Sequence, residues 1–80
     1  MRVEAEVSLY PLGEERLSPF ITSFVNVLKE HGCEAEVGQM STLVKGDTAQ
    51  VFDALKAGYE KAAGQGGCVL IVHVSNACPM

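Results

Sequence analysis

The chain has 80 residues, which suffices for one small domain and leaves no room for a second hydrophobic core. Hydrophobic residues make up 48% and charged residues 20%, a composition typical of a globular protein, and no apolar run approaches the roughly 18 residues that span a membrane. Six basic against ten acidic residues give a net charge of −4, which argues against nucleic acid as a partner because phosphate binding needs a basic surface.

The first segment, residues 2–10, alternates between apolar and polar side chains. The apolar side consists of Val3, Ala5, Val7 and Leu9, and the polar side of Glu4, Glu6, Ser8 and Tyr10. A period of two predicts a strand with one face on a core. The glutamates also interrupt the apolar stretch that a signal peptide would need, so we expect a cytoplasmic protein.

A helix is expected next, with Ser18 as its N-cap and Pro19 at its first position. Its apolar stripe comprises Phe20, Ile21, Phe24, Val25, Val27 and Leu28. This spacing predicts an amphipathic helix, which Gly32 should end.

Two short strands follow, over residues 33–37 and 40–45, with a tight turn at Gly38-Gln39 between them. The alternation in the later strand places Met40, Thr42 and Val44 on one side. We expect Gly46 to end this strand.

A second helix is predicted from Asp47 or Thr48, and Gln50 can reach back to the cap. Its apolar face comprises Val51, Leu55, Tyr59 and Ala62. Gly58 inside the helix predicts close packing on a neighbouring backbone, because a helical glycine costs about 1 kcal/mol relative to alanine. A cluster of glycines at 64, 66 and 67 should end the helix.

The last strand spans residues 68–75, and its continuous apolar run over 69–72 predicts an interior strand or one covered on both faces. The order β-α-β-β-α-β predicts one α+β domain over residues 1–80. Its expected fold is a ferredoxin-like sandwich of four antiparallel strands with both helices on one face.

This fold leaves one face of the sheet uncovered. The polar side of the first strand should line it, together with Leu43, Ile71, His73 and Ser75. Such a face is too apolar to stay in water, so we expect a homodimer or homotetramer that associates through the sheet face.

Patterns for catalysis or metal binding are weak. The three cysteines, Cys33, Cys68 and Cys78, form no Cys-x-x-Cys pair, and we interpret them as small hydrophobic residues. No phosphate-binding loop opens a helix, and neither arginine lies where an acylphosphatase on this fold would need it. We therefore expect a protein that is not an enzyme, with no catalytic residue, no metal and no cofactor.

Hydroxyl and amide groups cluster at the ends of three predicted strands. The pairs are Ser8 with Tyr10, Ser41 with Thr42, and Ser75 with Asn76. Any one of these groups can simply satisfy an edge or a turn. Three such pairs at three strand ends predict the hydrogen-bonding groups of one cavity. That cavity would hold a flat nitrogen heterocycle between apolar walls.

Four separated strings resemble the YkoF-like family, whose members bind thiamine and its hydroxymethylpyrimidine precursor. They are Ser8–Pro11, Met40–Gly46, Val51–Ala57 and Ser75–Pro79. Pro11-Leu12-Gly13 and Gly46-Asp47 also resemble the related single-domain thiamine-binding family. YkoF-like proteins carry two such domains in tandem, so the resemblance implies that self-association replaces the covalent pair here.

The resemblance implies binding without turnover, in thiamine salvage or transport. On this interpretation, donors and acceptors for the pyrimidine come from Ser8, Ser41, Thr42 and Asn76. Glu6 or Asp47 would favour the thiazolium cation, and Tyr10 would offer an aromatic face. Two alternatives stay open, namely an ACT-like regulatory sensor of amino acids and an oligomerisation module without a ligand.

Overall fold

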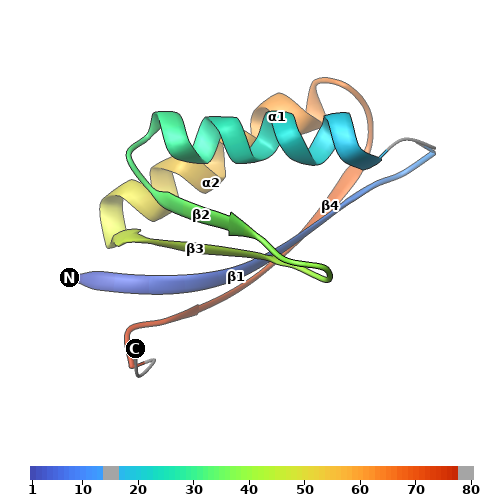
Figure 1. Cartoon of the computed structure of the whole chain (residues 1–80). Helices are drawn as coiled ribbons and strands as arrows, with labels where there is room; N and C mark the ends of the chain where they lie inside the picture. Colours follow the sequence, from blue (N-terminus) through green and yellow to red (C-terminus); the bar gives the residue numbers. More distant parts are fainter. Residues whose placement is uncertain (14–16, 78–80) are drawn as a thin grey trace.

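The structure, a computed structural model, describes residues 1–13 and 17–77. The elements in chain order are β1 (Arg2–Pro11), α1 (Leu17–Glu30), β2 (Glu34–Val37), β3 (Thr42–Asp47), α2 (Thr48–Ala63) and β4 (Cys68–Ser75). The strands form one sheet in the order β2-β3-β1-β4, and every neighbouring pair is antiparallel. Both helices lie on the same face of the sheet (Figure 1), which confirms the predicted ferredoxin-like α+β fold.

The core lies between this sheet and the two helices, on the side of β1 that the alternating sequence predicts to be buried. The buried side chains of β1 are Val3, Ala5, Val7 and Leu9, as the period of two predicts. They meet the apolar stripes of the helices, which include Phe20, Phe24 and Leu28 from α1 and Val51, Ala54 and Leu55 from α2. The opposite sides of the strands face outward, and Leu43, Ile71, His73 and Ser75 lie on this open face as expected.

Several strand and helix ends differ from the prediction. Strand β1 runs to Pro11 and β2 begins at Glu34, each one residue later than predicted. Helix α1 begins at Leu17, so Ser18 lies inside the helix instead of capping it. Met40 is 88% exposed and precedes β3, because it belongs to a turn in which the Gly38 N–H donates to the Ser41 carbonyl at 2.8 Å. Gly46 does not end β3, since it still pairs with a residue of β1 and the strand continues to Asp47.

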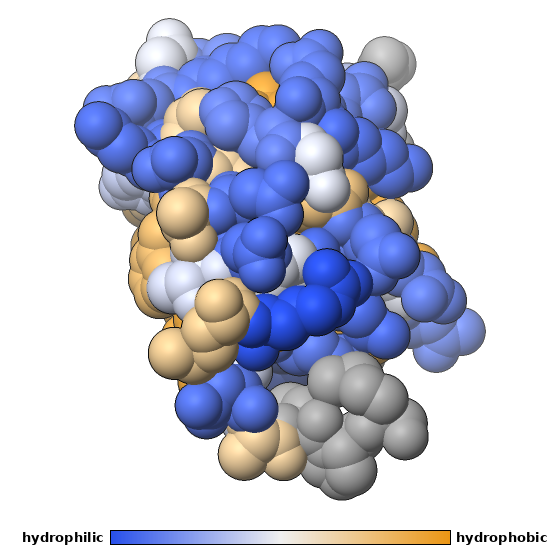
Figure 2. Space-filling model, turned by 90° about the vertical axis from the view of Figure 1, so that its left-hand side faces the viewer, coloured by the Kyte–Doolittle hydropathy of each residue, from blue (hydrophilic) through white to orange (hydrophobic). Residues whose placement is uncertain are grey.

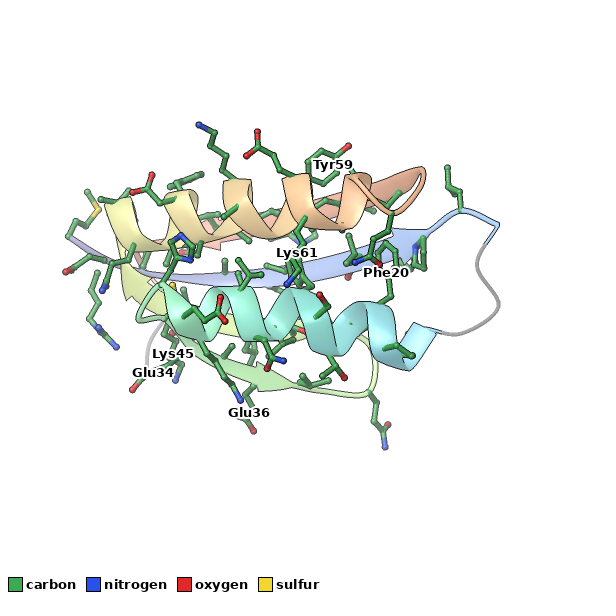
Figure 3. All side chains as sticks on the ribbon, turned by 90° about the horizontal axis from the view of Figure 1, so that it is seen from above. Phe20, Glu34, Glu36, Lys45, Tyr59 and Lys61 are labelled. Carbon is green, nitrogen blue, oxygen red and sulfur yellow. The ribbon has the colours of Figure 1, made fainter. Side chains whose placement is uncertain are left out.

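Helix α2 starts as predicted, with Asp47 as N-cap and the Asp47 N–H donating to Gln50 Oε1 at 3.2 Å. Tyr59 is 39% exposed, so the prediction that it belongs to the buried face of α2 is wrong. Figure 3 shows Tyr59 on the outer side of this helix. Gly58 is buried against the ring of Phe24 in α1, where an added Cβ would lie 2.8 Å from the ring atoms. The close contact is therefore with a side chain and not with a backbone.

Strand β4 lies at the edge of the sheet, which contradicts the prediction of an interior strand. Its inward residues Leu70 and Val72 pack against the core, whereas Val69 and Ile71 are 42% and 45% exposed on the open face. The apolar run is continuous because two of its residues face the core and the other two form an apolar stretch on the open face.

Candidate functional site

A cavity forms where the β2–β3 hairpin ends and β1 continues alone. The β1–β3 ladder stops at the pair Val7 and Thr42, while β1 runs on to Pro11. No described strand pairs with β1 on that side beyond Val7, so its backbone there is open to another molecule. The hollow beside it, which we call the hairpin cavity, has a volume of about 310 Å³.

The hairpin cavity has apolar walls and a small set of hydroxyl groups. Its apolar lining comes from Val7, Leu9, Ile21, Phe24, Val37 and Met40. Its polar lining residues are Ser8, Tyr10, Gln39, Ser41 and Thr42. Thr42 lies on the helix side of the sheet with Val7, whereas Ser8 and Tyr10 alternate with the buried Val7 and Leu9 and border the cavity from the strand edge. Four of the six predicted binding residues therefore meet around one hollow, a composition typical of small-molecule pockets.

Thr42 is the one buried polar side chain among the described residues, with 6% of its surface exposed. It pairs with Val7 on one side and Val37 on the other, at the inner wall of the hairpin cavity. Its hydroxyl makes no side-chain hydrogen bond to any residue that the structure describes. No fully buried side-chain nitrogen or oxygen atom among the described residues lacks a hydrogen-bond partner, so the Thr42 hydroxyl is not an orphaned buried group, and Thr42 counts here as a polar residue that lines the cavity.

The other hydroxyl groups lie closer to solvent. Ser8 and Ser41 are half-buried, and Tyr10 is 50% exposed. Ser41 Oγ donates to Glu6 Oε2 at 3.2 Å, and Glu6 Oε1 lies 3.7 Å from His73 Nδ1 on the open face. The rim of the hairpin cavity is therefore connected to a carboxylate through Ser41.

A second hollow of about 180 Å³, which we call the acidic hollow, adjoins the first across the β2–β3 turn. The two share Gly38, Gln39, Met40 and Ser41. The acidic hollow is otherwise lined by Glu6, Leu43 and Glu36. These three residues form one row across β1, β3 and β2, because Leu43 is the register partner of both glutamates.

Ser75 and Asn76 lie at the opposite end of the sheet, so the prediction that all six residues line one cavity is wrong for a single chain. Ser75 pairs with Glu4, whereas Ser8 pairs with Ile71. Four strand residues, or roughly 13 Å, separate the two groups along the sheet.

The reason is that β1 and β4 are antiparallel, so the last residues of β4 meet the first residues of β1. There Ser75 and Asn76 line a separate hollow of about 350 Å³ with Arg2, Glu4 and Lys45. The surface at the end of the molecule where the chain begins is mainly hydrophilic (Figure 2). Asp47 is the cap of α2 and pairs with Arg2, so it also lies away from the hairpin cavity.

Sequence reasoning missed Ile21 and Phe24 as cavity residues and Glu36 as part of the acidic hollow. The helical stripe identified the first two as core residues, and only the packing of α1 over the hairpin turns them toward a cavity. Glu36 alternates with apolar residues in β2, which was the available signal for a position on the open face.

The cysteines fit their interpretation as apolar residues, with Cys78 outside the described residues. Cys33 is buried and belongs to the core, and Cys68 packs against it. Burial raises the pKa of the Cys33 thiol, which keeps it neutral at neutral pH. Within residues 1–13 and 17–77, no three His, Cys, Asp or Glu side chains are grouped to hold a metal ion. Neither described helix is long and apolar enough to cross a membrane.

Comparisons with known proteins agree with this fold. A family model described as thiamine-binding protein matches residues 5–75. A comparison with the curated proteins finds no match.

Among solved structures, a hypothetical protein of Methanocaldococcus jannaschii has a TM-score of 0.88 at 23% identity, covering 99% of this chain and 84% of that one. A Thermotoga maritima protein assigned provisionally to thiamine biosynthesis or salvage has a TM-score of 0.82 at 22% identity, covering 94% and 83%. A Streptococcus pneumoniae protein has a TM-score of 0.82 at 18% identity, covering 94% and 86%. At these identities the structures support the fold alone.

Proposed function

Because the chain belongs to the thiamine-binding protein family, we propose that it binds thiamine or the hydroxymethylpyrimidine precursor in the hairpin cavity, without turnover. The observation that carries the proposal is the hairpin cavity, in which Thr42, a buried polar residue, lies beside the apolar Val7 and Phe24. A pyrimidine with an exocyclic amine needs both donors and acceptors, and a hydroxyl group supplies both. The volume of about 310 Å³ suits a small ligand, since such pockets span roughly 300–1,000 Å³.

We further propose a carrier role in thiamine salvage or transport. A protein that binds this ligand without turnover is suited to hold and deliver it. The Thermotoga maritima protein of the same fold is itself assigned provisionally to thiamine biosynthesis or salvage.

Thermal unfolding with and without ligand tests the binding proposal directly. Thiamine or hydroxymethylpyrimidine at about 100 times its dissociation constant should stabilise the protein by roughly 2.7 kcal/mol. For a chain of this length, that corresponds to a rise in melting temperature on the order of 10 °C. Amino acids should produce no rise, which separates this proposal from an amino-acid sensor. A flat response to both pyrimidines would refute the proposed function.

A second copy of the chain is the partner we propose for the open face. Tyr10 pairs with Val69, and Ile71 lies beside them on β4, so these three exposed side chains form one apolar patch without a charge. Two copies related by a two-fold axis can join such a patch without like-charge repulsion. A domain of this size also gains more from the added buried surface than a large one.

Light scattering should therefore give at least twice the mass of one chain. Replacing Ile71 with lysine should shift the protein to the monomer, because two copies would then bring like charges together in the apolar patch. Phe52, which is 51% exposed on α2, provides the matched control, and its replacement with lysine should leave the mass unchanged. A wild-type monomer would contradict the proposed interface.

A further inference from the structure

The outer edge of β4 is an open strand edge. Strand β4 lies last in the sheet, and no described strand pairs with it on the side away from β1 (Figure 1). The Leu12 N–H donates to the Gly67 carbonyl at 2.8 Å, so the main-chain groups of Gly67 point toward β1. These groups alternate in direction along a strand, and β4 pairs with β1 one residue to one residue. The main-chain groups that point to the open edge are therefore those of Cys68, Leu70, Val72 and Val74.

The sequence of β4 does not protect this edge from another strand. Protein sheets usually blunt an exposed edge with charged residues, proline, a bulge or a very short strand. Residues 68–74 contain no proline and no Asp, Glu, Lys or Arg, and β4 is eight residues long. The opposite edge of the sheet differs, because β2 has four residues and two of them are Glu34 and Glu36. The edge of β4 is therefore the one suited to pairing with another strand.

The apolar side chains of β4 are incompletely covered. Leu70 and Val72 point toward the core but are only half-buried, whereas their register partners Leu9 and Val7 are 7% and 2% exposed. On the other face, Ile71 is 45% exposed. A strand that covers this edge should therefore be apolar on both faces. Among the described strands, β4 itself has this property, since the outward sides of β1, β2 and β3 carry charged residues.

We propose that β4 pairs with β4 of a second copy, antiparallel about a two-fold axis, so that the two sheets become one. This surface is separate from the open face, and the inference does not depend on the proposed ligand. The chain has a net charge of −4, and like charges brought together at an interface oppose association. Residues 68–74 contain no carboxylate, so two copies can approach along this segment.

A register centred on Ile71 uses the whole edge. Cys68 then pairs with Val74 of the other copy, and Leu70 pairs with Val72, so that each outward N–H donates to an outward carbonyl. Ile71 faces its own counterpart on the open face, which brings the apolar patches of the two copies side by side. Association of two such pairs through the open face would give a tetramer, and Ile71→Lys would then disrupt both interfaces.

Hydrogen exchange of single amides, measured by nuclear magnetic resonance on the full chain, tests the pairing without a substitution. The amides of Val69 and Ile71 point toward β1 and are protected in a single chain. If the β4 edges pair, the amides of Leu70 and Val72 should exchange as slowly, about 100-fold below the rate of an unpaired strand edge. Fast exchange of these two amides in the wild-type protein would overturn the proposal, as would a monomeric wild-type protein.

Val74→Pro removes an outward N–H and places a proline ring in the path of the second strand. This N–H points away from β1 and Val74 is 38% exposed, so the variant should still unfold cooperatively. Its mass by light scattering should be half that of the wild type, and the Leu70 and Val72 amides should exchange about 100-fold faster.

The matched control is Val74→Ala, which shortens the same side chain but keeps the N–H, and it should match the wild type in mass and exchange. A folded Val74→Pro variant with the wild-type mass would show that the copies associate through the open face alone and would overturn the edge pairing. For a Val74→Pro variant that does not fold, the wild-type exchange rates decide the question.

Discussion

Replacing Thr42 with valine should weaken the binding of thiamine about tenfold to hundredfold while the protein stays folded. Valine has nearly the shape of threonine, so the contacts with Val7 and Val37 on the neighbouring strands are kept. Only the hydroxyl is lost, and the ligand atom that it served is left unpaired in an apolar cavity. Calorimetry on the purified variant measures the change in dissociation constant.

The stability of the ligand-free variant separates a binding role from a structural one. The Thr42 hydroxyl has no described hydrogen-bond partner, so Thr42→Val should unfold at the same denaturant concentration as the wild type or at a higher one. Thr22→Val makes the same chemical change at an exposed position of α1 and should alter neither property. Wild-type affinity in Thr42→Val would remove this residue from the site, and a loss of stability would assign it to the fold instead.

The elements of the fold could be predicted because each has its own period in the sequence. The alternation of β1 and the helical stripe of α1 each identify a buried face without knowledge of any partner element. The position of β4 in the sheet could not be predicted in this way. An apolar run over 69–72 fits both a strand covered on two sides and an edge strand whose outer face is apolar.

The part of the candidate site that lies where neighbouring strands meet could be predicted from the sequence. Ser41 and Thr42 follow the hairpin turn, and an antiparallel pairing brings them beside Ser8 on β1. The same reasoning, applied to β4, places Ser75 at the far end of β1, and the prediction of one cavity overlooked this consequence. The part contributed by Phe24 could not be predicted, because it depends on how α1 crosses the hairpin and on the contact with α2.

That contact makes Gly58 a position at which a small change should damage the fold. A Cβ at Gly58 would lie 2.8 Å from both Cδ1 and Cε1 of Phe24, closer than carbon atoms can approach without a shift. Gly58→Val should therefore lower the free energy of unfolding by about 2 kcal/mol, and the melting temperature by on the order of 10 °C. Because Phe24 lines the hairpin cavity, thiamine binding should weaken too.

Ala63→Val adds comparable bulk to an exposed position of the same helix and should keep the wild-type melting temperature. A second substitution, Phe24→Leu, removes the ring that meets the new side chain. In the Gly58→Val background it should therefore cost less stability than in the wild type, as expected for two residues in direct contact. Wild-type stability in Gly58→Val, or strict additivity of the two changes, would show that the α1–α2 contact does not depend on the glycine. In that case the shape of the hairpin cavity would have to be fixed from the sheet side, by Val7 and Thr42.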